Sequence, residues 1–183
     1  MSAAAIEKAR APVTDVIVES ELWNAAPDAE ATVRRALVEA AHAIGADFDR
    51  RAVAVLLTDD AAIRRLNAQW RGLDKPTNVL SFPPAASGLS HHHEGEARSL
   101  GDIAIAYETT ACEADAEDKR FVHHLAHLAV HGFLHLMGYD HESEAQAEQM
   151  ERLERVILAR LGISDPYLAQ GLAPESPARE IRG

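Results

Sequence analysis

The segment from Phe121 to Gly138 constrains the fold more than any other, because it is apolar almost all the way round a helix. Such a helix belongs in the centre of a domain, where other elements cover most of its surface. Its polar residues are mainly histidines, and at about 100° per residue His124, His127 and His135 project within about 40° of His131. Since unpaired polar groups are costly to bury, these histidines must face a cleft or hydrogen-bonding partners.

Histidines four residues apart on a helix can bind one zinc ion. Three pairs in this segment have that spacing: His123 with His127, His127 with His131, and His131 with His135. The last pair is distinguished by Gly138, which can adopt the left-handed conformation that ends a helix and can let the chain return His141 toward the pair. Three histidines and a water are typical of catalytic zinc, whereas structural zinc usually has four protein ligands. We therefore predict a metal site formed by His131, His135 and His141.

Other histidines are expected to have lesser roles. Three on the same helix are predicted to be solvated or to lie beside the metal ligands: His123, His124 and His127. Asp140 or Glu142 follows the turn closely enough to orient a ligand through a hydrogen bond. The histidine run at 91–93 lies in a predicted loop, 84–99, where adjacent side chains point in different directions, so it is a weaker metal candidate.

The segment His131–His135 resembles the H-E-x-x-H motif of metalloproteases but has glycine at position 132, where those enzymes need a general-base glutamate. Peptide hydrolysis by that mechanism is therefore disfavoured. A metallopeptidase-like hydrolase that uses another base remains a weaker alternative.

Composition limits the remaining classes. The 183 residues, 47% of them apolar, suit one folded domain with short extensions. Cys112 is the single cysteine, which excludes an internal disulfide, and we expect it to be a small buried residue. No run of about 18 apolar residues and no apolar secretory leader is present, which predicts a cytoplasmic protein with no membrane contact.

The charge balance argues against nonspecific nucleic-acid binding. The chain has 18 basic and 29 acidic side chains, a net charge of −11, and nucleic-acid affinity comes largely from phosphate neutralisation by Lys and Arg. Up to Pro83 the charges nearly balance, with 10 basic and 12 acidic residues. A basic patch is therefore expected only on the N-terminal half, which contains paired arginines at 34–35, 50–51 and 64–65.

Apolar patterning and turn residues predict alternating strands and helices. Strands are expected at 15–19, 52–57, 78–82 and 102–106, and helices at 28–44, 59–72, 108–116, 120–137 and 143–161. Residues 164–183 contain three prolines and little apolar periodicity, and they are interpreted as a flexible C-terminal tail. The strand order cannot be deduced from these spacings.

Three blocks of sequence resemble the YbeY family, bacterial single-strand-specific metallo-endoribonucleases involved in rRNA maturation and ribosome quality control. The blocks are residues 131–141, residues 66–71 with 74–83, and residues 100–105. The similarity covers residues 14–163, which leaves 1–13 as an N-terminal extension and 164–183 as the tail. It implies an α+β, zincin-like single domain with a small mixed sheet of about four strands.

The resemblance also implies functional residues. It implies one zinc ion bound by His131, His135 and His141, and catalytic roles for Arg71 and His131. An arginine beside the metal is chemically sensible, because its guanidinium stays charged and matches phosphate oxygens. Three residues at or just before the start of the third strand could shape the substrate groove: Lys75, Thr77 and Asn78. We expect this groove to be locally positive and lined by Arg71, Lys75 and some of the paired arginines.

The leading hypothesis is a zinc-dependent endoribonuclease acting on single-stranded RNA in 16S rRNA 3′ end maturation and ribosome quality control. Its partners would be rRNA, together with ribosomal proteins or the small ribosomal subunit. The alternative is a non-catalytic ribosome-assembly factor, in which zinc stabilises the turn after the helix and the acidic segment 142–154 meets a basic ribosomal protein.

Overall fold

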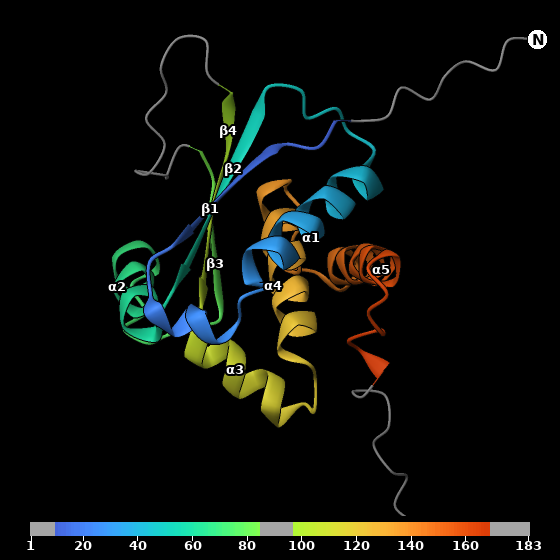
Figure 1. The fold of residues 1–183 in the computed structure, drawn as a ribbon. Coiled ribbons are helices and arrows are strands. Elements are labelled where there is room, and N and C mark those ends of the chain that lie inside the picture. Colours follow the sequence, from blue (N-terminus) through green and yellow to red (C-terminus); the bar gives the residue numbers. More distant parts are fainter. Residues whose placement is uncertain (1–9, 85–96, 169–183) are drawn as a thin grey trace, which may run out of the picture.

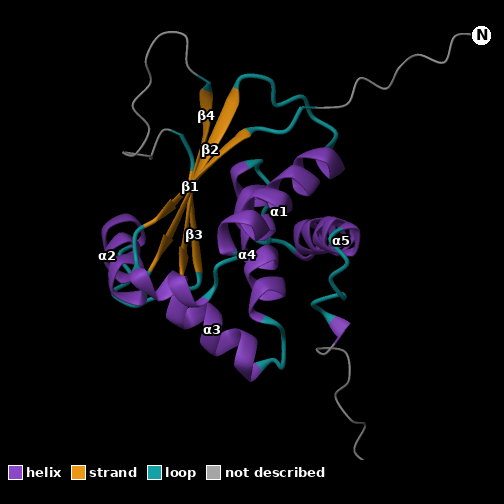
Figure 2. Ribbon diagram, in the orientation of Figure 1, coloured by secondary structure: helices purple, strands orange, loops and turns teal. Residues whose placement is uncertain are grey.

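The computed structural model describes residues 10–84 and 97–168, which form one α+β domain. Its strands are β1 (Val13–Val18), β2 (Arg51–Thr58), β3 (Val79–Phe82) and β4 (Arg98–Ala106). Its helices are the 3-10 helix η1 (Glu21–Ala25) and α1 (Ala29–Ile44), α2 (Asp60–Arg71), α3 (Tyr107–Ala116), α4 (Phe121–Leu136) and α5 (Glu144–Arg160). The predicted class and strand number are confirmed (Figure 2).

The four strands form one mixed sheet in the order β1-β2-β4-β3. β1, β2 and β4 are parallel, and β3 runs antiparallel to β4, with Val79 opposite Ile105. β3 is therefore an edge strand. The loop that connects α2 to β3 lies next to the C-terminal end of α4. Thr77 and Asn78 of this loop therefore line a cavity together with His135.

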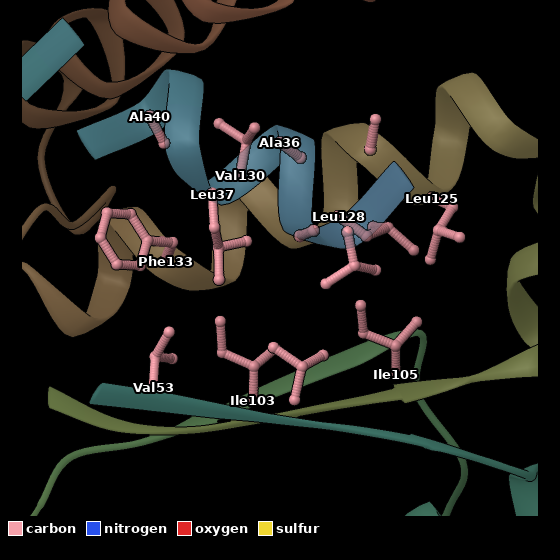
Figure 3. Packing of buried hydrophobic residues seen from close by; sticks show 14 of the residues in the cluster. Ala36, Leu37, Ala40, Val53, Ile103, Ile105, Leu125, Leu128, Val130 and Phe133 are labelled. Atoms are coloured by element: carbon pink, nitrogen blue, oxygen red, sulfur yellow. The ribbon is translucent and has the colours of Figure 1, made fainter. Parts of the chain in front are cut away.

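The main core lies between the sheet and the helices α1, α4 and α5 (Figure 1). In Figure 3, Leu37 of α1 and Leu128 of α4 lie above Ile103 and Ile105 of β4. All four are buried, and burying one such side chain contributes about 1.5–3 kcal/mol. A smaller apolar cluster around Ile63 packs α2 against the opposite face. The apolar helix thus occupies the domain centre, as its sequence predicts.

The described structure departs from the sequence predictions at several points. β4 begins at Arg98 instead of residue 102, because Arg98 and Ser99 already pair with β2 before a register shift. The 3-10 helix η1 was not predicted; it buries Trp23, whose indole Nε1 donates to the carbonyl of Thr58 over 2.8 Å. Cys112 is exposed on α3, so the prediction of a buried residue was wrong.

Other sequence predictions concern residues outside or at the edge of the described parts. The histidine run 91–93 lies outside the described residues. Of the predicted tail, residues 164–168 are described, and they pack against α5 and the loop before α4. Within the described ranges 10–84 and 97–168, no helix is both long enough and apolar enough to cross a bilayer.

Candidate metal centre

The C-terminal half of α4 presents His131 and His135 one helical turn apart, at the edge of the buried face. Gly132 lets this part of the helix approach the sheet closely. A Cβ atom built on Gly132 would lie 3.0 Å from Cγ2 of Ile103 and 3.1 Å from Oγ of Ser81, and that Oγ donates to the Gly132 carbonyl over 2.9 Å. At the helix position that holds a glutamate in metalloproteases, any side chain would therefore crowd the sheet from its Cβ atom onward.

The turn after α4 brings a third imidazole to the pair. Gly138 has a φ of +88°, a conformation that L side chains rarely adopt, and Tyr139 N donates to the Leu134 carbonyl over 3.0 Å. The ring centroid of His141 then lies 5.9 Å from that of His131 and 5.1 Å from that of His135. The left-handed turn expected from the sequence is therefore present.

The three imidazoles could hold one metal ion. One ligand nitrogen from each of His131, His135 and His141 lies within 4.8 Å of the other two, and the Nε2 atoms of His131 and His135 are 3.1 Å apart. Imidazole nitrogens are ligands for zinc and several other first-row metals. Among the residues that the structure describes, no other group of three histidine, cysteine or carboxylate ligands converges in this way.

Glu154 of α5 orients one of these rings. Its Oε1 lies 2.7 Å from Nδ1 of His131, and its side chain is fully buried. A carboxylate only accepts hydrogen bonds, so Nδ1 donates and the Nε2 lone pair of His131 remains available for a metal. Sequence reasoning missed Glu154, although it lies on the buried face of α5 with Met150, Ile157 and Leu158.

The surroundings of Glu154 and His135 favour an ionised carboxylate and a neutral imidazole. Burial alone would raise the pKa of Glu154, but hydrogen bonds from His127 and His131 outweigh it and lower that pKa to about 2. Burial lowers the pKa of His135, as does electrostatic repulsion between its protonated form and the neighbouring His131 and His141 rings. The carboxylate is therefore ionised and the His135 ring neutral near pH 7, as metal coordination requires.

A cavity of about 560 Å³ opens beside the three imidazoles. Arg71, the last residue of α2, lines it together with Thr77 and Asn78, which precede β3. Lys75 is not among the lining residues; its carbonyl accepts from Asn67 Nδ2 over 2.8 Å. The structure thus brings the ligand histidines together with three of the four other residues that the sequence singled out.

The charge of the cavity differs from the expected positive groove. Arg71 is the one Lys or Arg side chain among the described residues lining it, and Asp140 and Glu142 also line it. The paired arginines do not contribute: Arg64, for example, forms a bidentate pair with Asp74 outside the cavity. Positive charge is therefore concentrated at Arg71 and at whatever cation the histidines bind.

Asp140 and Glu142, the predicted orienting carboxylates, do not hydrogen-bond to a ligand ring. Oδ1 of Asp140 accepts instead from the backbone N–H of His141 over 2.7 Å, which fixes the turn. Both residues lie close to His141 in sequence, but Glu154 approaches His131 from the buried side, where its hydrogen bond is shielded from water.

Two of the three remaining histidines of α4 form hydrogen bonds with carboxylates. His127 Nε2 lies 3.1 Å from Oε2 of Glu154, and His124 Nε2 lies 2.8 Å from Oε2 of Glu113. The pair of His127 and Glu154 is largely buried, and in the other pair His124 is buried while Glu113 is partly exposed. His123 lies near Arg120, closer to the surface. His127 is thus connected to His131 through Glu154.

Comparison with known proteins agrees with this geometry. The family model described as Endoribonuclease YbeY matches residues 18–162. Endoribonuclease YbeY of Rhodopseudomonas palustris is 60% identical over 159 residues, covering 87% of this chain and 83% of that protein. The proteins of the same name from Bradyrhizobium sp. and Bradyrhizobium diazoefficiens are 56% and 59% identical, covering 85% of this chain in each case and 92% and 85% of the relatives.

A solution structure of TM1509 from Thermotoga maritima is a more distant match, with 24% identity and a TM-score of 0.45, covering 90% of this chain and 99% of that one. The family match includes α4, the turn after it, Arg71 and Glu154. On the family model and on relatives of 55–60% identity, this chain belongs to the YbeY endoribonuclease family.

Proposed function

We propose that this chain is a zinc-dependent endoribonuclease that cleaves single-stranded RNA at the cavity beside His131, His135 and His141. The single observation that carries the proposal is that Arg71 lines the same cavity as the three imidazoles, although 60 residues separate it from His131 in sequence. Three imidazole ligands and a permanent cation around one space suit a substrate with a phosphodiester group. The family membership of the chain gives this substrate class independently.

The histidines, Glu154 and Arg71 have different roles in the proposed reaction. The three histidines would hold the metal through one nitrogen each, and Glu154 fixes the orientation of His131. A bound zinc ion would polarise a phosphoryl oxygen and acidify a water molecule. The guanidinium of Arg71 binds the nonbridging oxygens of the scissile phosphate and stabilises the negative charge that develops on them.

The residues before β3 shape the wall of the cavity. Thr77 offers a hydroxyl group that can contact the RNA backbone. Asn78 has a more structural role, because its Oδ1 accepts from Val79 N over 2.7 Å and its Nδ2 donates to Glu113. Lys75, outside the lining, would contact RNA only beyond the cavity.

The substrate that we propose is rRNA in the cytoplasm, with the 3′ end of 16S rRNA as the site of maturation and ribosome quality control as the wider role. The net charge of −11 disfavours tight nonspecific binding to RNA. Selection of the substrate would then depend on the small ribosomal subunit or its proteins presenting a single-stranded segment to the cavity.

A cleavage assay with tag-free protein and a labelled single-stranded RNA tests the activity. The wild type, Arg71→Ala and His131→Ala are prepared identically and assayed with and without a chelator. Arg65→Ala is the matched control, because Arg65 is an exposed arginine of the same helix that does not line the cavity. We expect chelator-sensitive cleavage in the wild type and the control, and its loss in both cavity variants.

Equal cleavage by all four preparations would identify a contaminating nuclease and contradict the proposed site. A second outcome would favour the non-catalytic assembly factor. In that case the wild type does not cleave RNA, and the wild type and Arg71→Ala support rRNA maturation in cells equally well.

A further inference from the structure

The segment after α5 is attached to the domain at several points. Gly162 ends the helix with a φ of +74°, and Figure 1 shows the following residues, in red, descending from α5. Lys119, in the loop before α4, donates to the carbonyl of Pro166 over 3.3 Å. Asp165 forms an ion pair with Arg155 of α5 at 3.3 Å. These contacts place residue 167 against the buried side of α4 and α5.

Tyr167 inserts its hydroxyl group into the hydrogen-bond network of the metal centre. The hydroxyl donates to Oε2 of Glu154, and the ring packs edge-on against His127, with 5.8 Å between centroids. The guanidinium of Arg155 covers the same ring at 4.9 Å from its centroid. Tyr167 is therefore held on both sides, with its polar atom directed at Glu154.

The carboxylate of Glu154 depends on these neighbours. It is 0% exposed, so every hydrogen bond that it accepts must come from the protein. Oε1 accepts a hydrogen bond from His131, and Oε2 accepts hydrogen bonds from His127 and Tyr167. A buried carboxylate that loses one of its donors is less well stabilised and less well fixed in position.

We propose that Tyr167 is a positioning residue for the metal ligand His131, acting through Glu154. The hydroxyl group holds Oε2, so that Oε1 remains directed at Nδ1 of His131 and the opposite ring nitrogen at the metal. The short segment 163–168 is thus part of the metal centre and not a free tail. This inference rests on the proposed metal site, but it is tested by metal binding and not by RNA cleavage.

Tyr167→Phe tests the role of the hydroxyl group alone, because phenylalanine keeps the ring that packs on His127 and under Arg155. Tyr107→Phe is the matched control: its ring packs with Trp23 and Phe121 at the other end of α4. Zinc affinity is measured on the full chain by competition with a chromophoric chelator. The absorption spectrum of the Co²⁺-loaded protein reports ligand geometry, and the melting temperature of the metal-free protein reports stability.

Loss of a residue that orients a metal ligand commonly weakens binding 10- to 100-fold, and for Tyr167, one hydrogen bond further away, we expect about 3- to 10-fold. The Co²⁺ spectrum should change in Tyr167→Phe and not in Tyr107→Phe. Zinc affinity within twofold of wild type, together with an unchanged spectrum, would overturn the proposal. Failure of the wild type itself to bind zinc would instead overturn the proposed function.

A double-variant comparison tests the route through Glu154. If Tyr167 acts through this carboxylate, Tyr167→Phe should weaken zinc binding no further once Glu154→Gln is present. Full additivity of the two losses would contradict the route. Should Glu154→Gln fail to fold, His127→Phe takes its place, because it keeps a ring but removes the other donor to the same carboxylate oxygen. In combination with Tyr167→Phe it should weaken zinc binding by more than the two single losses combined.

Discussion

Nδ2 of Asn78 donates to both carboxylate oxygens of Glu113, at 3.1 and 2.9 Å. The same carboxylate accepts from Nε2 of His124, whose side chain is 6% exposed. This contact joins the loop before β3 to the consecutive helices α3 and α4, and Asn78 and Glu113 are 35 positions apart in sequence. A wall of the cavity is thereby fixed to the helix that carries the metal ligands.

Replacing Glu113 with glutamine should destabilise the protein by about 1–3 kcal/mol, because an NH2 donor replaces one of the two oxygens that accept from Asn78, and a neutral amide oxygen is a weaker acceptor for the buried His124. The free energy of unfolding of the metal-free protein, from urea denaturation, measures this effect. Asp115→Asn is the control, since Asp115 is exposed on the same helix. Equal stability of the two variants would show that the Glu113 contacts contribute nothing.

Gly132→Glu, which recreates the metalloprotease motif, should unfold the domain or destabilise it by more than about 3 kcal/mol. The Cβ atom of the new side chain would lie 3.0 Å from Cγ2 of Ile103 and 3.1 Å from Oγ of Ser81, and the carboxylate would add a charge at a buried helix position. Gly132→Ala provides the graded comparison, because glycine to alanine within a helix otherwise stabilises by about 1 kcal/mol. Thermal and urea unfolding measure both changes. A Gly132→Glu protein of wild-type stability would contradict the close approach of α4 to the sheet.

The sequence predicts α4 and its turn well, because both depend on local signals. An apolar helix, histidines at a spacing of four and a glycine that ends the helix are all contained in residues 121–141. The start of β4 and the exposure of Cys112 were not predictable in the same way. The first depends on pairing with β2, and the second on which side of α3 the rest of the domain covers.

Glu154 shows where sequence reasoning failed although a signal existed. It lies in a segment rich in glutamates, most of which face solvent, so composition suggests an acidic surface. Its position relative to Met150, Ile157 and Leu158, however, places it on the apolar face of α5. A charged residue on such a face needs a partner. The identity of that partner, His131 on another helix, requires the three-dimensional packing of α4 against α5.

Gly138→Val should weaken zinc binding by about tenfold with little effect on packing. A Cβ atom at position 138 would meet no atom within 4 Å, so the penalty comes from the backbone, whose φ of +88° disfavours a β-branched residue. The turn would relax and His141 would move away from the other two ligands. Gly138→Asn is the matched variant, because asparagine tolerates positive φ better. Competition with a chelator measures the zinc affinity of both variants. A zinc affinity of Gly138→Val equal to that of the wild type would refute the role of the turn.

Zinc should raise the melting temperature of the wild type and leave that of His141→Ala almost unchanged. An ion that binds the folded state alone stabilises it by about 2.7 kcal/mol at a hundredfold excess over its dissociation constant. His141 is exposed, so its removal should cost the metal-free fold little while removing one of three ligands. His123→Ala is the control, because His123 lies on α4 outside the ligand group. Melting curves with zinc and with chelator give the shift for each protein. A zinc-dependent shift in His141→Ala as large as in the wild type would mean that the stabilising ion binds elsewhere.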